Sequence, residues 1–178
     1  YYKVASAPVY NSNTMELNYK LIGNGTKKLV LIHGLAGSKN YWKRDLEEIT
    51  KTHSLLLIDL LGFGDSPKPK SNYNLSTQLK AIENVIKKEN FNDGQTVIVG
   101  HSLGAIISLS LFAKQPNWFQ GVTAIGLPIV TSKKQFIKNL ANNSYFDKLA
   151  VSKYGKLVCM FHPIYTLKWF KPKNLTDE

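Results

Sequence analysis

Short, unbroken apolar runs in the chain are separated by longer stretches in which apolar residues recur every three or four positions. The short runs are typical of strands buried on both faces, and the longer stretches of helices that bury one face. Together with a looser alternating run near the beginning, the short runs predict strands over Met15–Ile22, Lys28–Ile32, Ser54–Asp59, Thr96–Val99 and Gly121–Gly126. The longer stretches predict helices over Trp42–Thr50, Leu75–Lys88 and Ser102–Lys114. Strands that alternate with helices form βαβ crossovers, so we expect an α/β fold with a mostly parallel sheet and helices on both faces.

The pattern changes after Pro128. A helix is predicted over Thr131–Leu149, and the following stretch, Val151–Phe170, is dense in aromatic and apolar residues without a clean alternation of strand and helix. We therefore expect a boundary near residues 127–130, which divides the chain into segments 1–127 and 128–178.

The formal net charge of +11 comes almost entirely from lysine, since Arg44 is the only arginine among the 23 basic residues. Proteins that bind nucleic acids rely on the planar, bidentate guanidinium group of arginine, and the lysines here are scattered rather than clustered. The composition therefore argues against a nucleic-acid partner and indicates a lysine-rich solvated surface.

The remaining composition excludes several other classes of protein. The single cysteine, Cys159, cannot form an internal disulfide or a Cys-only zinc site. No apolar run approaches the roughly 20 residues that span a bilayer, and the first residues carry no apolar signal core, so a cytoplasmic location is expected. Because the sequence contains no metal cluster, phosphate loop or dinucleotide fingerprint, we expect no cofactor.

The motif Gly100-His101-Ser102-Leu103-Gly104 lies between a predicted strand and a predicted helix. In this context G-x-S-x-G predicts a sharp, strained turn that exposes the serine hydroxyl as a nucleophile. The flanking glycines are required where a side chain would collide with the neighbouring strand or helix. Ser102 is therefore the candidate nucleophile.

A second motif, His33-Gly34-Leu35-Ala36-Gly37, follows the strand that ends at Ile32. The loop after this strand is expected beside the serine turn, at the carboxyl edge of the sheet where ligands bind. A tetrahedral intermediate needs two N–H donors, and the backbone groups of Leu35 and Leu103 are the candidates. His33, at the strand end, is predicted to bind loop backbone rather than act as the catalytic base.

A third motif runs from Asp59 to Pro69, with glycines at positions 62 and 64. Asp59 closes a strand, and its carboxylate can accept N–H bonds from the loop that follows. A role in organising this turn is favoured over an acid–base pair of Asp59 with Asp65.

These three motifs, in this order and spacing, resemble the α/β-hydrolase superfamily over roughly residues 15–127. The resemblance implies an eight-stranded, mostly parallel sheet, with residues 1–127 as the first part of the core and 128–178 as the beginning of a helical cap. Dehalogenases and epoxide hydrolases of this fold carry aspartate at the nucleophile position, so serine implies acyl chemistry on an ester, thioester or other acyl substrate, by hydrolysis or acyl transfer. The apolar cap segment suits an apolar substrate.

The histidine base and its acid are not evident in the sequence. Only His162 follows Ser102, with Asp147 between them in the right order, but a compact triad leaves too few residues for the remaining crossovers. We therefore expect the chain to be an N-terminal fragment, inactive alone, whose continuation supplies both groups. The alternative is a non-catalytic ligand-binding protein, or one completed by a partner chain. The basic, aromatic segment Leu157–Lys173 also suits contact with a membrane surface, although packing within a cap explains its apolar residues equally well.

Overall fold

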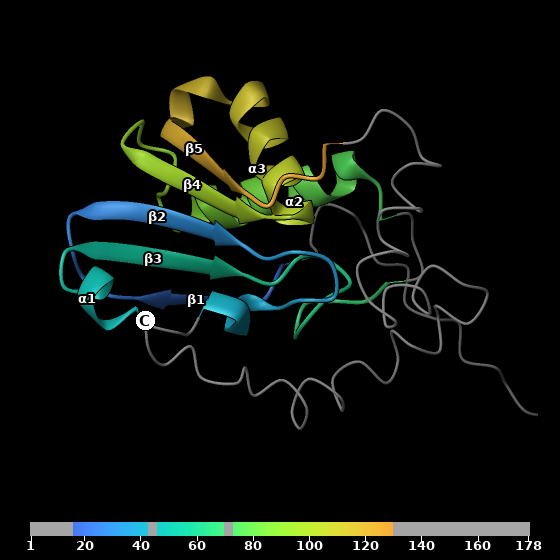
Figure 1. The fold of residues 1–178 in the computed structure, drawn as a ribbon, viewed down its shortest axis with the longest axis horizontal. Helices are drawn as coiled ribbons and strands as arrows, with labels where there is room; N and C mark the ends of the chain where they lie inside the picture. Colours follow the sequence, from blue (N-terminus) through green and yellow to red (C-terminus); the bar gives the residue numbers. More distant parts are fainter. Residues whose placement is uncertain (1–15, 43–45, 70–72, 130–178) are drawn as a thin grey trace, which may run out of the picture. The chain divides into compact units, whose positions relative to one another are not determined.

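The computed structural model describes residues 16–42, 46–69 and 73–129, and all structural statements below concern these residues. They form a single sheet with helices on both faces (Figure 1). The strands are β1 (Tyr19–Ile22), β2 (Lys27–Ile32), β3 (His53–Ile58), β4 (Thr96–His101) and β5 (Phe119–Ile125). The helices are α1 (Glu47–Thr50), α2 (Leu75–Lys88) and α3 (Leu103–Lys114), with short 3₁₀ turns η1 (Lys39–Trp42) and η2 (Pro116–Trp118).

The strand order is β1-β3-β2-β4-β5. Only β1 is antiparallel to its neighbour, and the other three pairings are parallel. The prediction of a mostly parallel α/β sheet is therefore confirmed. Strand β3 is buried on both faces, as its unbroken apolar run requires, since Leu55 to Ile58 are all buried, whereas alternate residues of β4 are only half-buried.

The helices lie on opposite faces because the chain reverses its direction of travel across the sheet. It leaves β2 for β3 through η1 and α1, and then passes back over β2 to β4 through α2. Since parallel crossovers keep one hand, these two connections must cover opposite faces. The connection from β4 to β5 continues in the second direction, so α3 packs beside α2.

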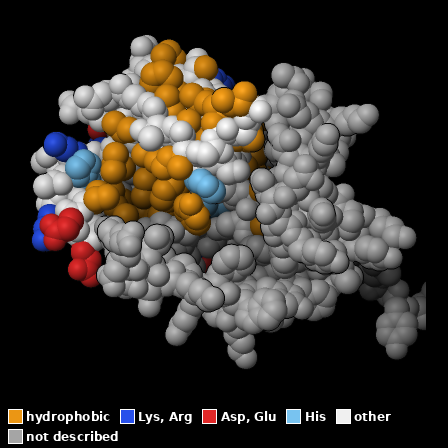
Figure 2. All heavy atoms as spheres, in the orientation of Figure 1, with side chains coloured by type: hydrophobic (Ala, Val, Ile, Leu, Met, Phe, Trp, Pro, Cys, Tyr) orange, Lys and Arg blue, Asp and Glu red, His pale blue; other side chains and the backbone are white. Residues whose placement is uncertain are grey.

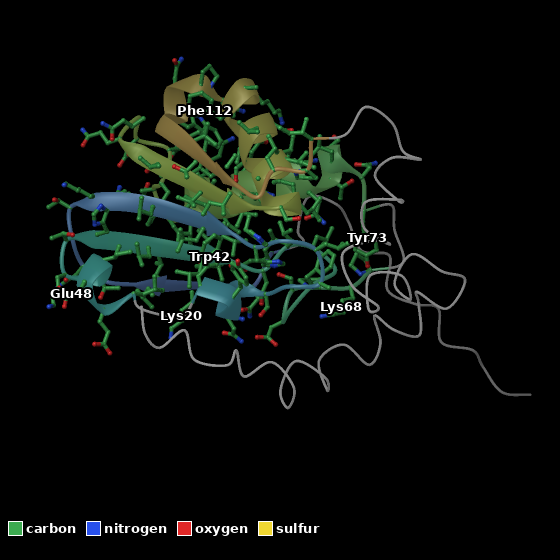
Figure 3. The ribbon with its side chains drawn as sticks, viewed as in Figure 1. Lys20, Trp42, Glu48, Lys68, Tyr73 and Phe112 are labelled. Carbon is green, nitrogen blue, oxygen red and sulfur yellow. The ribbon has the colours of Figure 1, made fainter. Side chains whose placement is uncertain are left out.

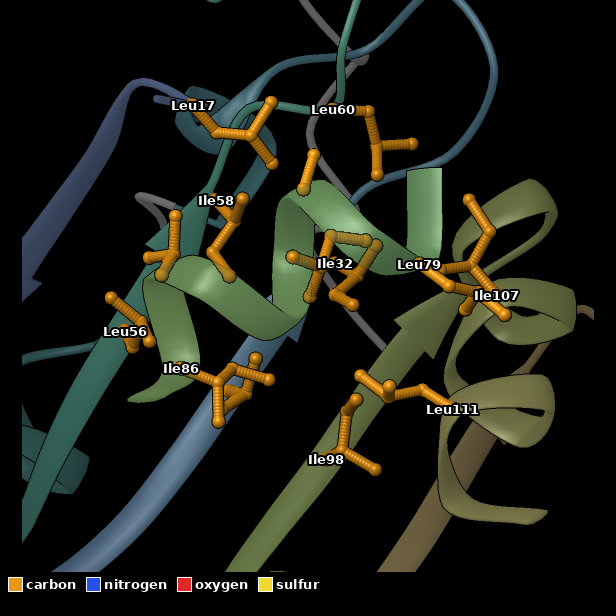
Figure 4. Packing of buried hydrophobic residues seen from close by; sticks show 14 of the residues in the cluster. Leu17, Ile32, Leu56, Ile58, Leu60, Leu79, Ile86, Ile98, Ile107 and Leu111 are labelled. Carbon is orange, nitrogen blue, oxygen red and sulfur yellow. The ribbon is translucent and has the colours of Figure 1, made fainter. Parts of the chain in front are cut away.

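The larger core lies under α2 and α3, where apolar residues of both helices meet one face of β2, β3 and β4 (Figure 4). Each fully buried Leu or Ile contributes about 1.5–3 kcal/mol relative to an exposed one. Seventeen buried residues make up this core, so it dominates the stability of the described part. In α2 the buried residues recur at the three- and four-residue spacing seen in the sequence, among them Leu79, Ile82 and Ile86.

The opposite face carries a smaller core of Leu31, Leu55 and Leu57, against which Trp42 and Leu46 pack. Figure 2 shows hydrophobic side chains gathered across the strands on this side of the molecule. In Figure 3, Trp42 lies over the sheet. Phe112 belongs to α3 and packs on the core of the other face.

Two predicted elements are shorter than the sequence pattern suggested. The first strand covers only Tyr19–Ile22 of the predicted Met15–Ile22, because Glu16 to Asn18 are not part of the ladder. The helix predicted over Trp42–Thr50 begins at Glu47, and Trp42 belongs instead to the 3₁₀ turn η1. Trp42 and Leu46 still pack on the sheet, so the apolar spacing belongs to two short elements rather than to one helix.

The predicted helix Thr131–Leu149 and the predicted cap segment lie outside the described residues. Within the part that the structure describes, no helix is long and apolar enough to cross a bilayer.

Candidate active site

The three motifs meet at the carboxyl edge of the sheet, around the ends of β2, β3 and β4. Strand β2 pairs with β3 on one side and with β4 on the other. The loops that follow β2 and β4 therefore begin side by side while their chains depart in opposite directions. This is the topological switch point at which open α/β sheets bind ligands.

Ser102 occupies the turn between β4, which ends at His101, and α3, which begins at Leu103. Its backbone has φ 52° and ψ −112°, a conformation that costs a non-glycine residue about 1–3 kcal/mol. The Ser102 side chain makes no capping hydrogen bond to α3. Its backbone N–H donates to the Ile125 carbonyl oxygen of β5 at 2.9 Å, which fixes the turn to the neighbouring strand. The sharp, strained turn expected from the motif is thus present.

The glycines on either side of Ser102 are required by close backbone contacts. A Cβ atom at Gly100 would overlap the Gly104 carbonyl group and lie 2.5 Å from Ser108 Oγ. A Cβ atom at Gly104 would overlap the Ile32 carbonyl oxygen at the end of β2. The two glycines therefore let α3 approach both β4 and β2, which brings the loop after β2 against the serine turn. Gly34 of that loop has so little space that a Cβ there would lie 3.2 Å from the Ser102 Cβ.

The predicted oxyanion donors lie in this loop and at the beginning of α3. No acceptor for the backbone N–H of Leu35 or of Leu103 exists among the described residues. Leu35 is 57% exposed, and Leu103 is the first residue of α3, where the helix dipole favours negative charge. Both N–H groups are thus available to a ligand beside Ser102, and their role as donors to an oxyanion stays a prediction.

His33 is fully buried, and both of its ring nitrogens bind backbone groups. The Leu60 N–H donates to Nε2 at 3.0 Å, so the ring proton is on Nδ1, which donates to the Gly34 carbonyl oxygen at 2.7 Å. Burial lowers the pKa of His33 and outweighs the opposing effect of the bond to Gly34, so the ring is neutral. The predicted structural role is confirmed, because neither nitrogen is available to accept a proton from Ser102.

Asp59 is fully buried and organises the loop after β3, as predicted. Its carboxylate accepts a hydrogen bond from the Asp65 N–H at 2.9 Å, and its own carbonyl oxygen accepts one from Ser66 Oγ at 2.7 Å. Gly64, at φ 50°, passes so close that a Cβ there would overlap the Asp59 carboxylate. Asp59 and Asp65 are joined through a cation, the Lys39 ammonium group, rather than as an acid–base pair.

Two residues of this region were missed by the sequence reasoning. Lys39 binds Asp59, and nothing in its sequence context distinguishes it from the other lysines. Gln78 of α2 binds the Leu61 backbone reciprocally: its Oε1 accepts from the Leu61 N–H at 3.1 Å, and its Nε2 donates to the Leu61 carbonyl oxygen at 2.8 Å. A signal for Gln78 was present, since it is a polar residue on the buried face of a helix and must find partners there.

The structure does not bring a base to Ser102 from the described residues. His53 begins β3, at the opposite edge of the sheet, and the His101 ring stacks on Tyr41 with centroids 4.9 Å apart. Asp147 and His162 lie outside the described residues. No group of three or more His, Cys, Asp or Glu side chains within the described ranges could hold a metal ion.

Comparison with known proteins agrees with this geometry. Residues 27–148 match the family model described as the alpha/beta hydrolase fold. The probable lysophospholipase BODYGUARD 4 of Arabidopsis thaliana is 39% identical over 110 residues, which cover 60% of this chain and 26% of that protein. A 2-hydroxy-6-oxo-6-(2'-aminophenyl)hexa-2,4-dienoic acid hydrolase of Metapseudomonas resinovorans is 31% identical over 104 residues, covering 57% of this chain and 35% of that protein. The chain thus spans about a quarter to a third of the length of these curated relatives.

A solved structure shows the same fold. MGS-M2, an alpha/beta hydrolase enzyme from a Medee basin deep-sea metagenome library, superposes with a TM-score of 0.65 at 24% identity. The match covers 85% of this chain and 56% of that one.

Proposed function

Because the chain belongs to the alpha/beta hydrolase family, we propose that the protein is a serine hydrolase that forms an acyl-enzyme on Ser102. The observation that carries the proposal is the strained backbone of Ser102 at the switch point of the sheet. Such strain persists only where the surroundings enforce it, and it clusters at sites where it serves function. The Ser102 side chain makes no capping hydrogen bond to the following helix, which supports a role for its hydroxyl group in attacking a substrate.

In the proposed reaction, Ser102 Oγ attacks the carbonyl carbon of the substrate while a base removes the hydroxyl proton. The carbonyl oxygen becomes an oxyanion, to which the N–H groups of Leu35 and Leu103 donate. Collapse of this intermediate expels the alcohol or thiol, which takes up the proton from the base. Water then attacks the acyl-enzyme by the same route and releases the carboxylic acid, which restores Ser102.

The proposed substrate is an apolar acyl ester or thioester. Large apolar side chains are exposed just after β2 and at the end of β5, at the same edge of the sheet as Ser102: Leu35, Ile125 and Leu127. These side chains suit a hydrocarbon chain, which gains free energy by leaving water. A relative at 39% identity is named a probable lysophospholipase, so a single-chain phospholipid is the first natural substrate to test.

Hydrolysis of p-nitrophenyl octanoate by the intact natural protein that contains this chain tests the proposal. Ser102→Ala is expected to lower kcat by at least about 10³-fold, because the nucleophile of such a site acts as part of a unit. Ser110→Ala in the same helix is the control, since the Ser110 hydroxyl donates to the Ile106 carbonyl oxygen within the helix. Ligand binding with no turnover in the wild-type protein, or full turnover by Ser102→Ala, would contradict the proposal.

The source of the base is decided by a second substitution. If Asp147 and His162 complete the triad, His162→Ala abolishes turnover as completely as Ser102→Ala does. If the base and acid lie elsewhere in the intact protein, His162→Ala retains turnover. Both outcomes are compatible with acyl chemistry on Ser102, so this experiment assigns the partners independently of the nucleophile.

A further inference from the structure

The loop that carries Leu35 is anchored at both ends to two consecutive residues that follow β3. At its beginning, His33 Nε2 accepts a hydrogen bond from the Leu60 N–H at 3.0 Å. At its end, Lys39 binds the Asp59 carboxylate through both its backbone N–H and its ammonium group. The position of the Leu35 N–H is therefore set by the loop after β3.

The segment between these anchors is strained. Ala36 has φ 57°, a left-handed conformation that residues with a Cβ atom disfavour. The turn is closed by the Gly37 N–H, which donates to the Gly34 carbonyl oxygen at 3.1 Å. A strained backbone of this kind relaxes unless the surrounding structure holds it. We therefore expect the loop to depend on its anchors.

The anchor at Lys39 is a partly buried ion pair in which only the Asp59 side chain is fully buried. The ammonium group lies 2.8 Å from Asp59 Oδ2 and 2.6 Å from Asp65 Oδ2, and the Lys39 side chain is only 12% exposed. Burial acts to lower the pKa of Lys39, but the two carboxylates outweigh it and raise the pKa, so the group stays charged. Because the Asp59 side chain is fully buried, loss of the Lys39 ammonium group would leave its carboxylate without that cation.

We propose that Lys39 is a positioning residue for acyl transfer, which clamps the Leu35 loop to Asp59 and so holds the Leu35 N–H where the oxyanion forms. The catalytic part of this inference rests on the proposed function. The clamp itself is a property of the described residues and can be tested without turnover.

Hydrogen exchange of the backbone amides tests the clamp. In Lys39→Met the ammonium group is lost while the side-chain bulk is kept, and amides of residues 33–42 are expected to exchange at least about tenfold faster, with those of α2 unchanged. Lys39→Arg, whose guanidinium can span both carboxylates, is expected to restore slow exchange. Lys51→Met is the control, because Lys51 forms an exposed ion pair with Glu48. Unchanged exchange in residues 33–42 of a folded Lys39→Met protein would overturn the clamp, as would equal acceleration across α2.

Turnover by the intact protein tests the catalytic part. Since the oxyanion exists only beyond the ground state, Lys39→Met is expected to lower kcat about 10- to 100-fold with little change in KM, and Lys39→Arg to recover it. A raised KM with unchanged kcat would overturn the positioning role. Absence of Ser102-dependent turnover in the wild-type protein would instead contradict the proposed function, and the exchange experiment would still decide the clamp.

Discussion

The identity of individual residues at the serine turn is determined by the space available for their side chains rather than by contact with solvent. Ser102 tolerates an unfavourable backbone conformation, and Gly100 and Gly104 are the only residue type that fits where α3 meets β4 and β2. The packing of the surrounding core offsets the free energy that the strained Ser102 backbone costs. We infer that this part of the molecule gives up stability to hold the serine in the strained turn.

Gly104→Ala is expected to destabilise the chain by about 1–3 kcal/mol, because the new methyl group would overlap the end of β2. Gly121→Ala is the matched control, since nothing lies within 4 Å of the position that its Cβ would take, and its free energy of unfolding should change by less than about 0.5 kcal/mol. Urea unfolding of the two variants measures both effects. An equal loss of stability in both would show that the close contact at Gly104 is not the reason for the glycine.

At the scale of elements, apolar spacing predicted the segments whose buried side chains form the core. The helix over Leu75–Lys88 has the predicted bounds, and the Asn74 side chain caps it by accepting a hydrogen bond from the Thr77 N–H at 2.8 Å. The helix beginning at Trp42 was predicted wrongly, because apolar spacing does not distinguish one helix from a 3₁₀ turn followed by a shorter helix that bury the same side chains.

The site was predictable from the sequence where a short motif is associated with one backbone geometry. The serine turn and the backbone roles of His33 and Asp59 follow from short sequences with a fixed place in the fold. Lys39 was not predictable, since its partner Asp59 is 20 residues away and the two meet only because β2 and β3 are neighbours. Contacts that form only through tertiary structure leave no pattern in the local amino-acid sequence.

The opposite edge of the sheet is tied together by Asp93, between α2 and β4. Its carboxylate accepts hydrogen bonds from the Gln95 and Thr96 N–H groups, at 3.0 and 3.1 Å, and forms an ion pair with Lys28 of β2 at 2.8 Å. Burial acts to raise the pKa of Asp93, but these donors outweigh it and lower the pKa from 3.8 to about 2. The beginnings of β2 and β4 are thus joined by a carboxylate that must be charged.

This depressed pKa predicts how stability depends on pH. The contribution of Asp93 is fully present above its ordinary pKa of 3.8 and is lost as pH falls through about 2, since the folded state then has to take up a proton. The free energy of unfolding should therefore fall less steeply between pH 5 and pH 2 in Asp93→Asn than in the wild-type chain. Urea unfolding at several pH values measures this, and parallel curves would contradict the assignment.

At the scale of the whole molecule, the strand order is what converts three separate motifs into one site. The ends of β2, β3 and β4 lie next to one another, so residues far apart in sequence share one edge of the sheet. The described part carries there Ser102, the proposed nucleophile, and the two N–H groups proposed as oxyanion donors, while the chain spans about a quarter of the length of the relative named a probable lysophospholipase. A complete catalytic unit needs a base and an acid in addition.

The most direct test of the account is the site at which a fluorophosphonate probe modifies the intact protein. The oxygen of an activated serine attacks the phosphorus of such a probe and displaces fluoride, so mass spectrometry of the digested protein should place one phosphonyl adduct on Ser102. Ser108, buried in the same helix, should stay unmodified and serves as an internal control. A single adduct on Ser102, abolished by Ser102→Ala, is the predicted result. No adduct on the folded intact protein, or an adduct on another residue, would contradict the assignment of Ser102 as the nucleophile.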